Sequence, residues 1–352
     1  MTGPVLVTGA TGFIAAHIVQ QLLERGERVR GTVRSLAAGD ALVQLRRLPG
    51  AAERLELVEA DLTRPGSFDA PAAGCAAIVH TASPYVLTVN DPQRDLVDPA
   101  VRGTLTVLEA AARSRSVARI VITSSMAAVT DEPDSNRVLT EADWNQSSSL
   151  TRNPYYYSKT LAERAAWRFV DEEKPGFDVV AINPFMVIGP ALTASVNPSN
   201  QVFVDLIKGT FPGILALTWG MVDVRDVADA HIRALATPSA RGRYLCAAGT
   251  ASMRDVVQLL RANGFDGAKL PTLPLDGPWI TAAVKLTLFT QPPGIASYLR
   301  THLGRVPRFD TAKIRAELGM AFRPLERTIL ETVADLARWG HLPGAGPAQK
   351  IE

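Results

Sequence analysis

The sequence predicts an α/β fold built on a doubly wound parallel sheet, with a smaller C-terminal lobe beside it. Three observations lead to this prediction. Short apolar runs typical of buried strands alternate with longer helical patterns, which is the order that produces a parallel sheet covered on both faces. A glycine-rich turn joins the first of these strands to the first helix. The length of 352 residues accommodates one large domain and an added lobe.

The expected elements follow from the spacing of the apolar residues. We expect strands at Val5–Thr8, Val29–Val33, Leu55–Glu59, Ala77–His80, Ile120–Thr123 and Val179–Asn183, and helices at Ala15–Arg25, Pro99–Ser114 and Pro154–Glu173. Ligands of open α/β sheets bind beyond the carboxyl ends of the strands, so functional residues are expected there.

The chain is expected to divide into a sheet domain and a lobe. Residues 1–189 are expected to form the sheet domain, and residues 219–248 to return to it. Residues 190–218 and 249–347 form the smaller lobe, in which proline-rich stretches indicate loops. Residues 348–352 are expected to be a frayed tail. The substrate pocket then lies between the two parts.

The first strand–helix turn reads Thr-Gly-Ala-Thr-Gly-Phe-Ile-Ala over residues 8–15. Gly9 allows a sharp turn, Gly12 lets the backbone approach a pyrophosphate, and Ala15 still permits close packing of helix on strand. The unpaired N–H groups at the start of the helix attract phosphate charge. A turn that needs glycine only for its backbone is the alternative, but the strand before it and the helix after it favour a dinucleotide site.

Two positions after the next strands bear on the kind of dinucleotide. No carboxylate ends the second strand, where one would hold the ribose hydroxyls of NAD, and Arg34 follows instead. Its planar guanidinium suits the 2′-phosphate of NADPH; the alternative is a solvated surface side chain. Asp61 follows the third strand and either closes a turn or accepts a hydrogen bond from the adenine amino group.

A tyrosine and a lysine four residues apart indicate proton chemistry. On the helix predicted at 154–173, Tyr155 and Lys159 project from one face, a turn apart. A nearby ammonium favours the phenolate, which lets a phenol exchange a proton with an alcohol or carbonyl oxygen near neutral pH. An unrelated surface pair is the alternative when this pair is taken alone. Ser125 follows the fifth strand in the same crevice, and no Gly-x-Ser-x-Gly pattern supports a hydrolase.

Composition excludes several classes of protein. The formal net charge is +2 and the basic residues are scattered, so we expect no nucleic-acid partner. Cys75 and Cys246 are far apart without metal-ligand spacing, which indicates a reducing compartment and no metal. The N-terminus lacks a signal-peptide pattern, and the apolar stretch at 279–290 is too short to span a bilayer. We therefore expect a cytoplasmic protein without a membrane partner.

With these motifs in order, the sequence resembles the extended short-chain dehydrogenase/reductase family. Within it, the chain is similar to the dihydroflavonol reductase-like branch, close to the NADPH-dependent methylglyoxal and carbonyl reductases. The matching segments are 8–15, 33–35, 80–84, 94–96, 99–101, 123–125, 155–163, 183–184, 189–190 and 222–227.

The resemblance implies a role for each matching residue. Ser125 steadies the substrate oxygen, Tyr155 donates the proton, and Lys159 lowers the pKa of Tyr155 and holds the nicotinamide ribose. The implied cofactor-binding residues are Gly9, Thr11, Gly12, Phe13, Ile14, Arg34, Asp61, Leu62, Thr81, Ala82, Ser83, Tyr155, Lys159, Pro184, Val187 and Ser199. The candidate substrate-binding residues are Pro84, Tyr85, Met126, Phe185 and Met186, with Trp219 and the stretch 279–289 as further wall.

The activity implied is the NADPH-dependent reduction of a ketone or aldehyde to an alcohol, with an aryl or alkyl substrate. Ala38 stands where relatives often carry a lysine, so NADH is an alternative cofactor. The family implies a monomer or a homodimer.

Two rival functions use the same fold. A sugar-nucleotide epimerase or dehydratase with bound NAD needs basic residues for a diphosphate, but 190–217 contains only Lys208. A non-catalytic dinucleotide-sensing regulator usually lacks the Tyr–Lys pair. Asp223, Arg225 and Asp226 are interpreted as charges that open a helix and tie the lobe to the sheet rather than as catalytic groups.

Overall fold

The computed structural model describes residues 3–37, 39–83, 89–265 and 269–342. Within these residues, seven strands form the central sheet, and every neighbouring pair in it is parallel. Across the sheet they are β11 (Gly242–Cys246), β7 (Asp178–Pro184), β5 (Arg119–Thr123), β4 (Ala77–His80), β1 (Val5–Thr8), β2 (Val29–Val33) and β3 (Leu55–Glu59). The chain order reverses between β1 and β4, so the predicted doubly wound sheet is confirmed.

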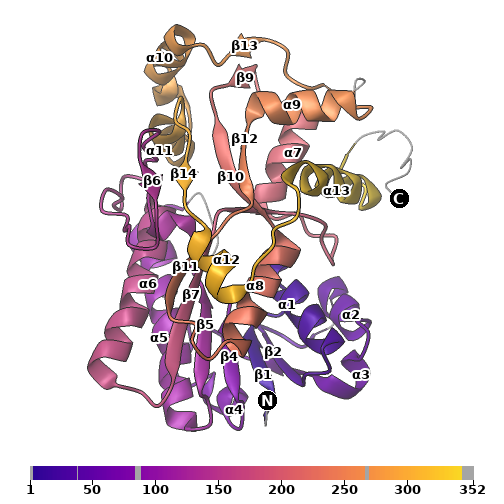
Figure 1. The fold of residues 1–352 in the computed structure, drawn as a ribbon, viewed down its shortest axis with the longest axis vertical. Coiled ribbons are helices and arrows are strands. Elements are labelled where there is room, and N and C mark those ends of the chain that lie inside the picture. The colour runs from indigo at the N-terminus through magenta and orange to yellow at the C-terminus, as the bar shows by residue number, and fades with distance from the viewer. Residues whose placement is uncertain (1–2, 38, 84–88, 266–268, 343–352) are drawn as a thin grey trace.

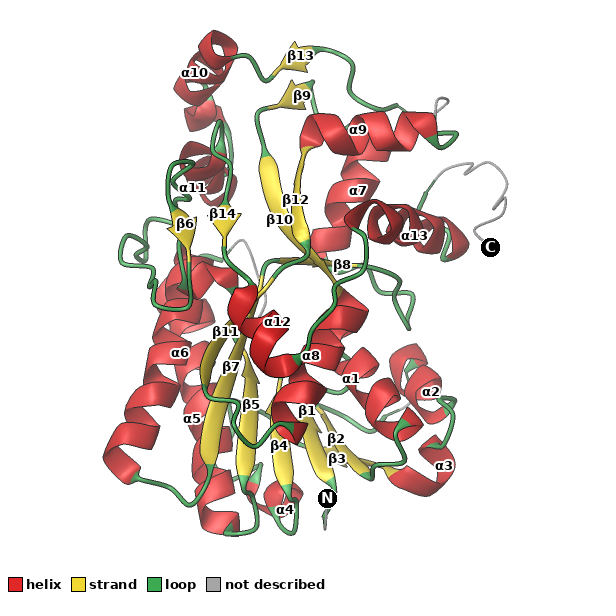
Figure 2. Ribbon diagram, viewed as in Figure 1, coloured by secondary structure: helices red, strands yellow, loops and turns green. Residues whose placement is uncertain are grey.

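Alternate residues of the strands face opposite layers of helices. Val5 and Val7 of β1 pack with α1 (Phe13–Glu24), whereas Leu6 between them packs with α5 (Asp98–Ser114). Burial on both faces explains why the strands read as continuous apolar runs. Figure 2 shows helices on both sides of the yellow sheet. One side carries α1, α2 (Asp40–Arg46), α3 (Ala51–Arg54) and α8 (Val224–Ala236), and the other carries α4 (Asp69–Ala72), α5 and α6 (Pro154–Glu173).

The predicted strands and helices lie where the spacing placed them, with small shifts at the ends. β5 begins one residue earlier than predicted, and β7 is longer by one residue at each end. The helix predicted at Ala15–Arg25 is α1, which already begins at Phe13 because Gly12 takes an extended conformation at its N-cap.

The lobe has a sheet of its own. In the described chain it contains three strands, β12 (Gly249–Ser252), β10 (Thr218–Asp223) and β8 (Met186–Ile188). The segment 219–248 therefore divides: β10 belongs to this small sheet, while α8 and β11 join the large one. Figure 1 shows the lobe beyond the carboxyl ends of the central strands.

The remaining elements pack on the helix layers of the large sheet, surround the small sheet or connect the two sheets. They are the π-helical turn η1 (Gln93–Val97), the 3-10 turns η2 (Met126–Ala128) and η3 (Leu288–Thr290), helices α7 (Pro198–Lys208), α9 (Met253–Ala262), α10 (Pro278–Leu286), α11 (Pro293–His302), α12 (Ala312–Leu318) and α13 (Leu325–Arg338), and the short strands β6 (Val138–Leu139), β9 (Ile214–Leu215), β13 (Pro274–Leu275) and β14 (Arg308–Phe309). Residues of α7, α9 and α13 form the core of the lobe with Met221 of β10. In contrast, Ile314 and Leu318 of α12 pack on the large sheet with Tyr244.

Candidate active site

The glycine turn lies at the carboxyl end of β1, where the strand order reverses. Gly9 has a φ of 64°, which favours glycine, and a Cβ there would be crowded by the Cβ of Ala82 at 3.1 Å. Gly12 is exposed, and among the described residues no side chain caps α1. The uncapped amides and the positive end of the helix dipole fit a pyrophosphate. Three neighbours in the turn are partly exposed: Thr11, Phe13 and Ile14.

Thr8 ties the glycine turn to the end of β4. Its hydroxyl oxygen accepts hydrogen bonds from the backbone N–H groups of Thr81 (3.1 Å) and Ala82 (3.0 Å). With both lone pairs used, the hydroxyl proton is donated to Nδ1 of His80 at 2.9 Å, which places the imidazole proton on Nε2. Burial, with the charge of Lys159, lowers the pKa of His80 to about 3, so the ring is neutral. His80 thus supports the predicted cofactor segment 81–83, a role that the sequence did not indicate.

Arg34 and Asp61 lie at the ends of neighbouring strands. Val33 pairs with Glu59, so the residues that follow them share one edge of the sheet, and Arg34 is exposed there. Asp61 accepts hydrogen bonds from the backbone N–H (2.8 Å) and the hydroxyl (2.7 Å) of Thr63. These bonds, with the charges of Arg64 and Arg34, hold the pKa of Asp61 below its usual value. Asp61 therefore closes its own turn, while Leu62 after it packs on α5 at Gly103.

The two serines after β5 point in different directions. The hydroxyl of the buried Ser124 donates to the carboxylate of Glu163 on α6. Ser125 is partly exposed, and its hydroxyl oxygen accepts a hydrogen bond from the backbone N–H of Ala127 at 3.2 Å as the cap of η2. In the part of the chain that the structure describes, the Ser125 hydroxyl proton has no acceptor and can be donated to a ligand, whereas Ser124 has a structural role.

Tyr155 and Lys159 lie one turn apart on α6, as predicted. The Lys159 Nζ is 5.8 Å from the centre of the Tyr155 ring, and both side chains are partly exposed. Burial lowers the pKa of Lys159 to about 8, which still leaves it mainly charged at neutral pH. η2 packs against the same helix, where the Thr160 hydroxyl donates to the Ala127 carbonyl at 3.4 Å. The phenol and the ammonium on α6 and the hydroxyl at the start of η2 therefore lie on two elements that pack together.

A buried polar cluster behind these residues holds them in place, and sequence reasoning missed its role. Glu163, four residues after Lys159, accepts hydrogen bonds from Arg243 of β11 at 2.6 Å and from the Asn183 amide at 2.8 Å. The Asn183 amide also donates to the Ser125 carbonyl at 3.2 Å. The i, i+4 spacing from Lys159 and the place of Glu163 in the matching segment 155–163 were the available signals for it.

The other predicted cofactor residues lie at the end of β7, in β8 and in α7. Pro184 ends β7, directly after Asn183, and Val187 in β8 is buried. Ser199 lies in the first turn of α7, where its backbone N–H donates to the Asn197 side chain at 2.9 Å. The next residue, Asn200, donates to the Gly189 carbonyl at 2.9 Å, which ties α7 to the start of the lobe.

The predicted substrate residues have mixed exposure. Met126 and Met186 are partly exposed, while Phe185 is buried against Phe309 of β14, with ring centres 4.4 Å apart. Of the additional wall residues, Trp219 is buried. In the stretch 279–289 Leu288 is buried in the core of the lobe, but Trp279 is 89% and Phe289 78% exposed. Pro84, Tyr85 and Ala38 lie outside the described residues.

The charges after β10 have the structural role that was predicted. The Asp223 carboxylate caps α8 through the backbone N–H of Arg225 (2.8 Å) and accepts a hydrogen bond from Thr328 of α13 (2.9 Å). Arg225 pairs with Glu331 of α13, and Asp226 pairs with Arg323. These bonds tie the lobe to the helix layer of the sheet.

Metal-ligand clusters and membrane-spanning helices are both absent from the described chain. It contains no group of His, Cys, Asp and Glu that could hold a metal ion. Across the same ranges, each helix is too short or too polar to cross a membrane.

A doubly wound sheet with an open glycine turn at its switch point, beside a Tyr–Lys pair, defines a dinucleotide-dependent oxidoreductase. A family model described as the NAD dependent epimerase/dehydratase family matches residues 5–247, and the chain belongs to this family. The resemblance to extended short-chain dehydrogenases/reductases is thereby confirmed.

Several relatives are reductases. The chain is 39% identical to "Cinnamoyl-CoA reductase CAD2" of Medicago truncatula, over 94% of this chain and 95% of that protein. Among solved structures, it resembles yeast methylglyoxal/isovaleraldehyde reductase Gre2 complexed with NADPH, with 29% identity, a TM-score of 0.80, and coverage of 96% of this chain and 100% of that one. Gre2 of Candida albicans in complex with NADPH is 33% identical, also with a TM-score of 0.80, over 96% and 99% of the two chains.

Proposed function

We propose that this protein is an NADPH-dependent carbonyl reductase in which Tyr155 donates the proton to the substrate oxygen. The observation that carries the proposal is the Lys159 ammonium 5.8 Å from the Tyr155 ring, at the sheet edge that also presents the open glycine turn. The cofactor, when bound, supplies the hydride. Relatives that are reductases and solved relatives that hold NADPH support the same reaction class.

The cofactor would be held along the carboxyl edge of the sheet. The α1 amides after Gly12 would bind the pyrophosphate, and Arg34 would bind the 2′-phosphate. Lys159 would hold the nicotinamide ribose. The other residues proposed to contact the cofactor are Asp61, Leu62, Thr81, Ala82, Ser83, Pro184, Val187 and Ser199.

The proton chemistry is the part that this chain supplies. The Ser125 hydroxyl and the Tyr155 phenol would donate hydrogen bonds to the carbonyl oxygen and stabilise the alkoxide that develops there. Lys159 would favour the phenolate that Tyr155 leaves behind. The nearby apolar side chains, Met126, Phe185 and Met186, favour a substrate with an aryl or alkyl group.

The two cysteines bear on the cellular location of the protein. Both cysteines, Cys75 and Cys246, are buried, and burial raises the pKa of each thiol, which keeps it protonated. A reducing cytoplasm suits such thiols. We propose a monomer or a homodimer, as in the family.

The test follows NADPH and then NADH absorbance with purified protein and methylglyoxal, an aryl ketone, a β-keto ester, a dihydroflavonol and a cinnamoyl thioester. We expect carbonyl-dependent oxidation of NADPH. Tyr155→Phe is expected to bind NADPH normally and to lose turnover by at least about 100-fold, because the proton donor is absent. Tyr157→Phe, a phenol on the same helix without a lysine at +4, is the matched control and should retain turnover. Normal turnover in Tyr155→Phe would overturn the assignment. No oxidation by the wild type, despite bound cofactor, would favour the epimerase or the regulator.

A further inference from the structure

The residue before the catalytic helix has an unusual backbone. Asn153 precedes Pro154 and Tyr155, and its φ of 48° and ψ of 58° lie in the left-handed region that L-residues other than asparagine and glycine rarely adopt. It is also buried, with 4% of its surface exposed. Its carbonyl accepts the first hydrogen bond of α6, from the backbone N–H of Tyr157 at 3.1 Å. The direction in which α6 leaves Asn153 therefore fixes the position of Tyr155.

Asn153 does not use its side chain as a helix cap. Within the described ranges its side chain makes no capping hydrogen bond to α6. Its amide instead donates to the Thr301 hydroxyl (3.1 Å) and to the Asp131 carboxylate (3.3 Å), and its backbone N–H donates to the Ser297 hydroxyl (3.0 Å). Ser297 and Thr301 are one turn apart on α11, so a single face of this helix of the lobe holds both groups of Asn153.

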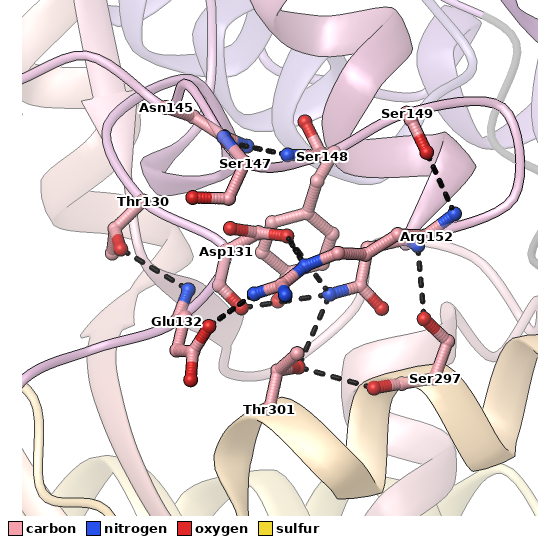
Figure 3. A network of polar contacts seen from close by, with 12 residues as sticks. Thr130, Asp131, Glu132, Asn145, Ser147, Ser148, Ser149, Arg152, Ser297 and Thr301 are labelled. Atoms are coloured by element: carbon pink, nitrogen blue, oxygen red, sulfur yellow. Dashed lines mark hydrogen bonds and ion pairs between the residues drawn. The ribbon is translucent and has the colours of Figure 1, made fainter.

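The charges around this junction are balanced. The Asp131 carboxylate, only 1% exposed, also accepts a hydrogen bond from Nε of Arg152 at 2.9 Å. Arg152 and Arg305 both pair with Glu132, which adds a second link to the lobe. Figure 3 shows Ser297 and Thr301 projecting from α11 toward the loop that carries Asp131 and Arg152.

The same turn of α11 contacts the residue after Tyr155. His302 follows Thr301, and its ring lies 5.7 Å from that of Tyr156 and stacks on Tyr298 at 4.1 Å. Tyr156 in turn lies edge-on to Tyr155, with ring centres 6.0 Å apart. α11 thus contacts the residues on both sides of the Tyr155–Pro154 pair.

We propose that Asn153 is a positioning residue for Tyr155, held by Ser297 and Thr301 so that the placement of α11 in the lobe sets the placement of the proton donor. The inference rests on the proposed function. It explains why a buried asparagine keeps a left-handed backbone without capping its helix: its polar groups serve the junction between lobe and catalytic helix. A misplacement of about 1 Å at the reacting group is enough to lower a rate by about 100-fold.

Thr301→Val tests the proposal, because valine keeps the shape of threonine and removes the acceptor for Asn153. We expect kcat to fall about tenfold or more, while KM and the NADPH dissociation constant change by less than about threefold. Thr301→Ser restores the hydroxyl and should return kcat to within about threefold of wild type. Ser135→Ala, which removes the hydrogen bond from the Val306 backbone elsewhere in the same junction, is the matched control and should keep kcat unchanged.

A second measurement is independent of turnover. Hydrogen exchange of the Tyr157 amide, which closes the first turn of α6, should be faster in Thr301→Val and in Asn153→Gly than in wild type or Ser135→Ala. Asn153→Gly keeps the left-handed backbone accessible and removes only the side chain. Unchanged exchange would overturn the proposal, as would an unchanged kcat in an active enzyme. A wild type without reductase activity would refute the proposed function alone, and the exchange rates would still decide whether α11 holds the helix.

Discussion

Arg34 is the side chain that should make the enzyme prefer NADPH over NADH. It is exposed just after β2, and its charge helps to lower the pKa of Asp61, which follows β3. A hydrogen bond to a charged group contributes about 1.5–3 kcal/mol, so Arg34→Ala should lower kcat/KM for NADPH by about 10- to 100-fold. The value for NADH should change by less than about twofold, because NADH lacks the 2′-phosphate. Arg46→Ala, another exposed arginine in the following helix, is the control; an unchanged NADPH/NADH ratio in Arg34→Ala would contradict the assignment.

Lys159 should make the stability of the cofactor-free protein depend on pH. Burial lowers its pKa to about 8, whereas a lysine in the unfolded chain keeps its proton to about pH 10.4. Between these values the unfolded state binds more protons, so the free energy of unfolding rises with pH. At pH 7 the folded protein holds a charge in a poorly solvated place, and partial exposure of the side chain reduces the resulting penalty to about 1–2 kcal/mol.

Lys159→Met should therefore stabilise the protein at pH 7 by about 1–2 kcal/mol while abolishing turnover. The difference from wild type should shrink as the pH rises from about 8 toward 10, because the folded protein then releases the Lys159 proton and no longer holds the buried charge. Calorimetry of both proteins without cofactor at pH 7 and pH 9.5 provides the measurement. A variant that is less stable than wild type at pH 7, by an amount independent of pH, would show that burial does not disfavour the Lys159 charge.

Among the elements, β11 and α6 are joined by a buried ion pair. Arg243 and Glu163 are 2.6 Å apart, with side chains 6% and 1% exposed. Removing one partner of a buried pair leaves a charge without compensation, so Arg243→Met should lower the free energy of unfolding by about 3–5 kcal/mol. Arg113 on α5 pairs with Asp69 at 2.7 Å, but both side chains are about half exposed, and Arg113→Ala should lower it by less than about 1 kcal/mol. Urea denaturation of both variants measures their losses in free energy of unfolding. Equal losses would contradict the larger role given to the buried pair.

The elements also show what could be predicted from the sequence. The Tyr155–Lys159 pair and the glycine turn depend on spacing within one helix and one turn, which the sequence displays directly. The α6 bounds, Pro154–Glu173, are those predicted, because proline starts the helix and its period is regular. Local patterns are sufficient where a short stretch of chain determines the geometry.

Contacts between distant residues could not be predicted in this way. Asn153 and Ser297 are 144 positions apart, and no spacing relates them. The short strands β8 and β12 carry too few apolar residues to be recognised as a second sheet. The stretch 279–289 is apolar enough to suggest a buried wall, yet Trp279 and Leu286 face solvent. The sequence shows which residues are apolar, but the tertiary fold determines whether other residues bury them.

At the scale of the whole molecule, the lobe is not an independent unit. The chain passes from β7 of the large sheet to β8 of the small one, returns through α8, and passes again from β11 to β12. α12, which lies far along the C-terminal segment, packs on the large sheet through Ile314 and Leu318. Asp335 of α13 accepts a hydrogen bond from the Ala191 backbone at 2.7 Å, which fixes the start of the lobe.

These crossings predict that the protein unfolds in one cooperative transition. Loss of α12 would expose buried apolar surface on the large sheet, and loss of α13 would break the buried Asp223–Thr328 bond, so neither part should persist alone. In calorimetry we expect one peak whose van't Hoff and calorimetric enthalpies agree. NADPH at about 100 times its dissociation constant should stabilise the folded state by about 2.7 kcal/mol and move the whole peak, because it binds only the folded protein. Two peaks, of which NADPH moves only one, would show instead that the dinucleotide-binding sheet folds without the lobe. In that case α12 and α13 would not couple the unfolding of the lobe to that of the sheet.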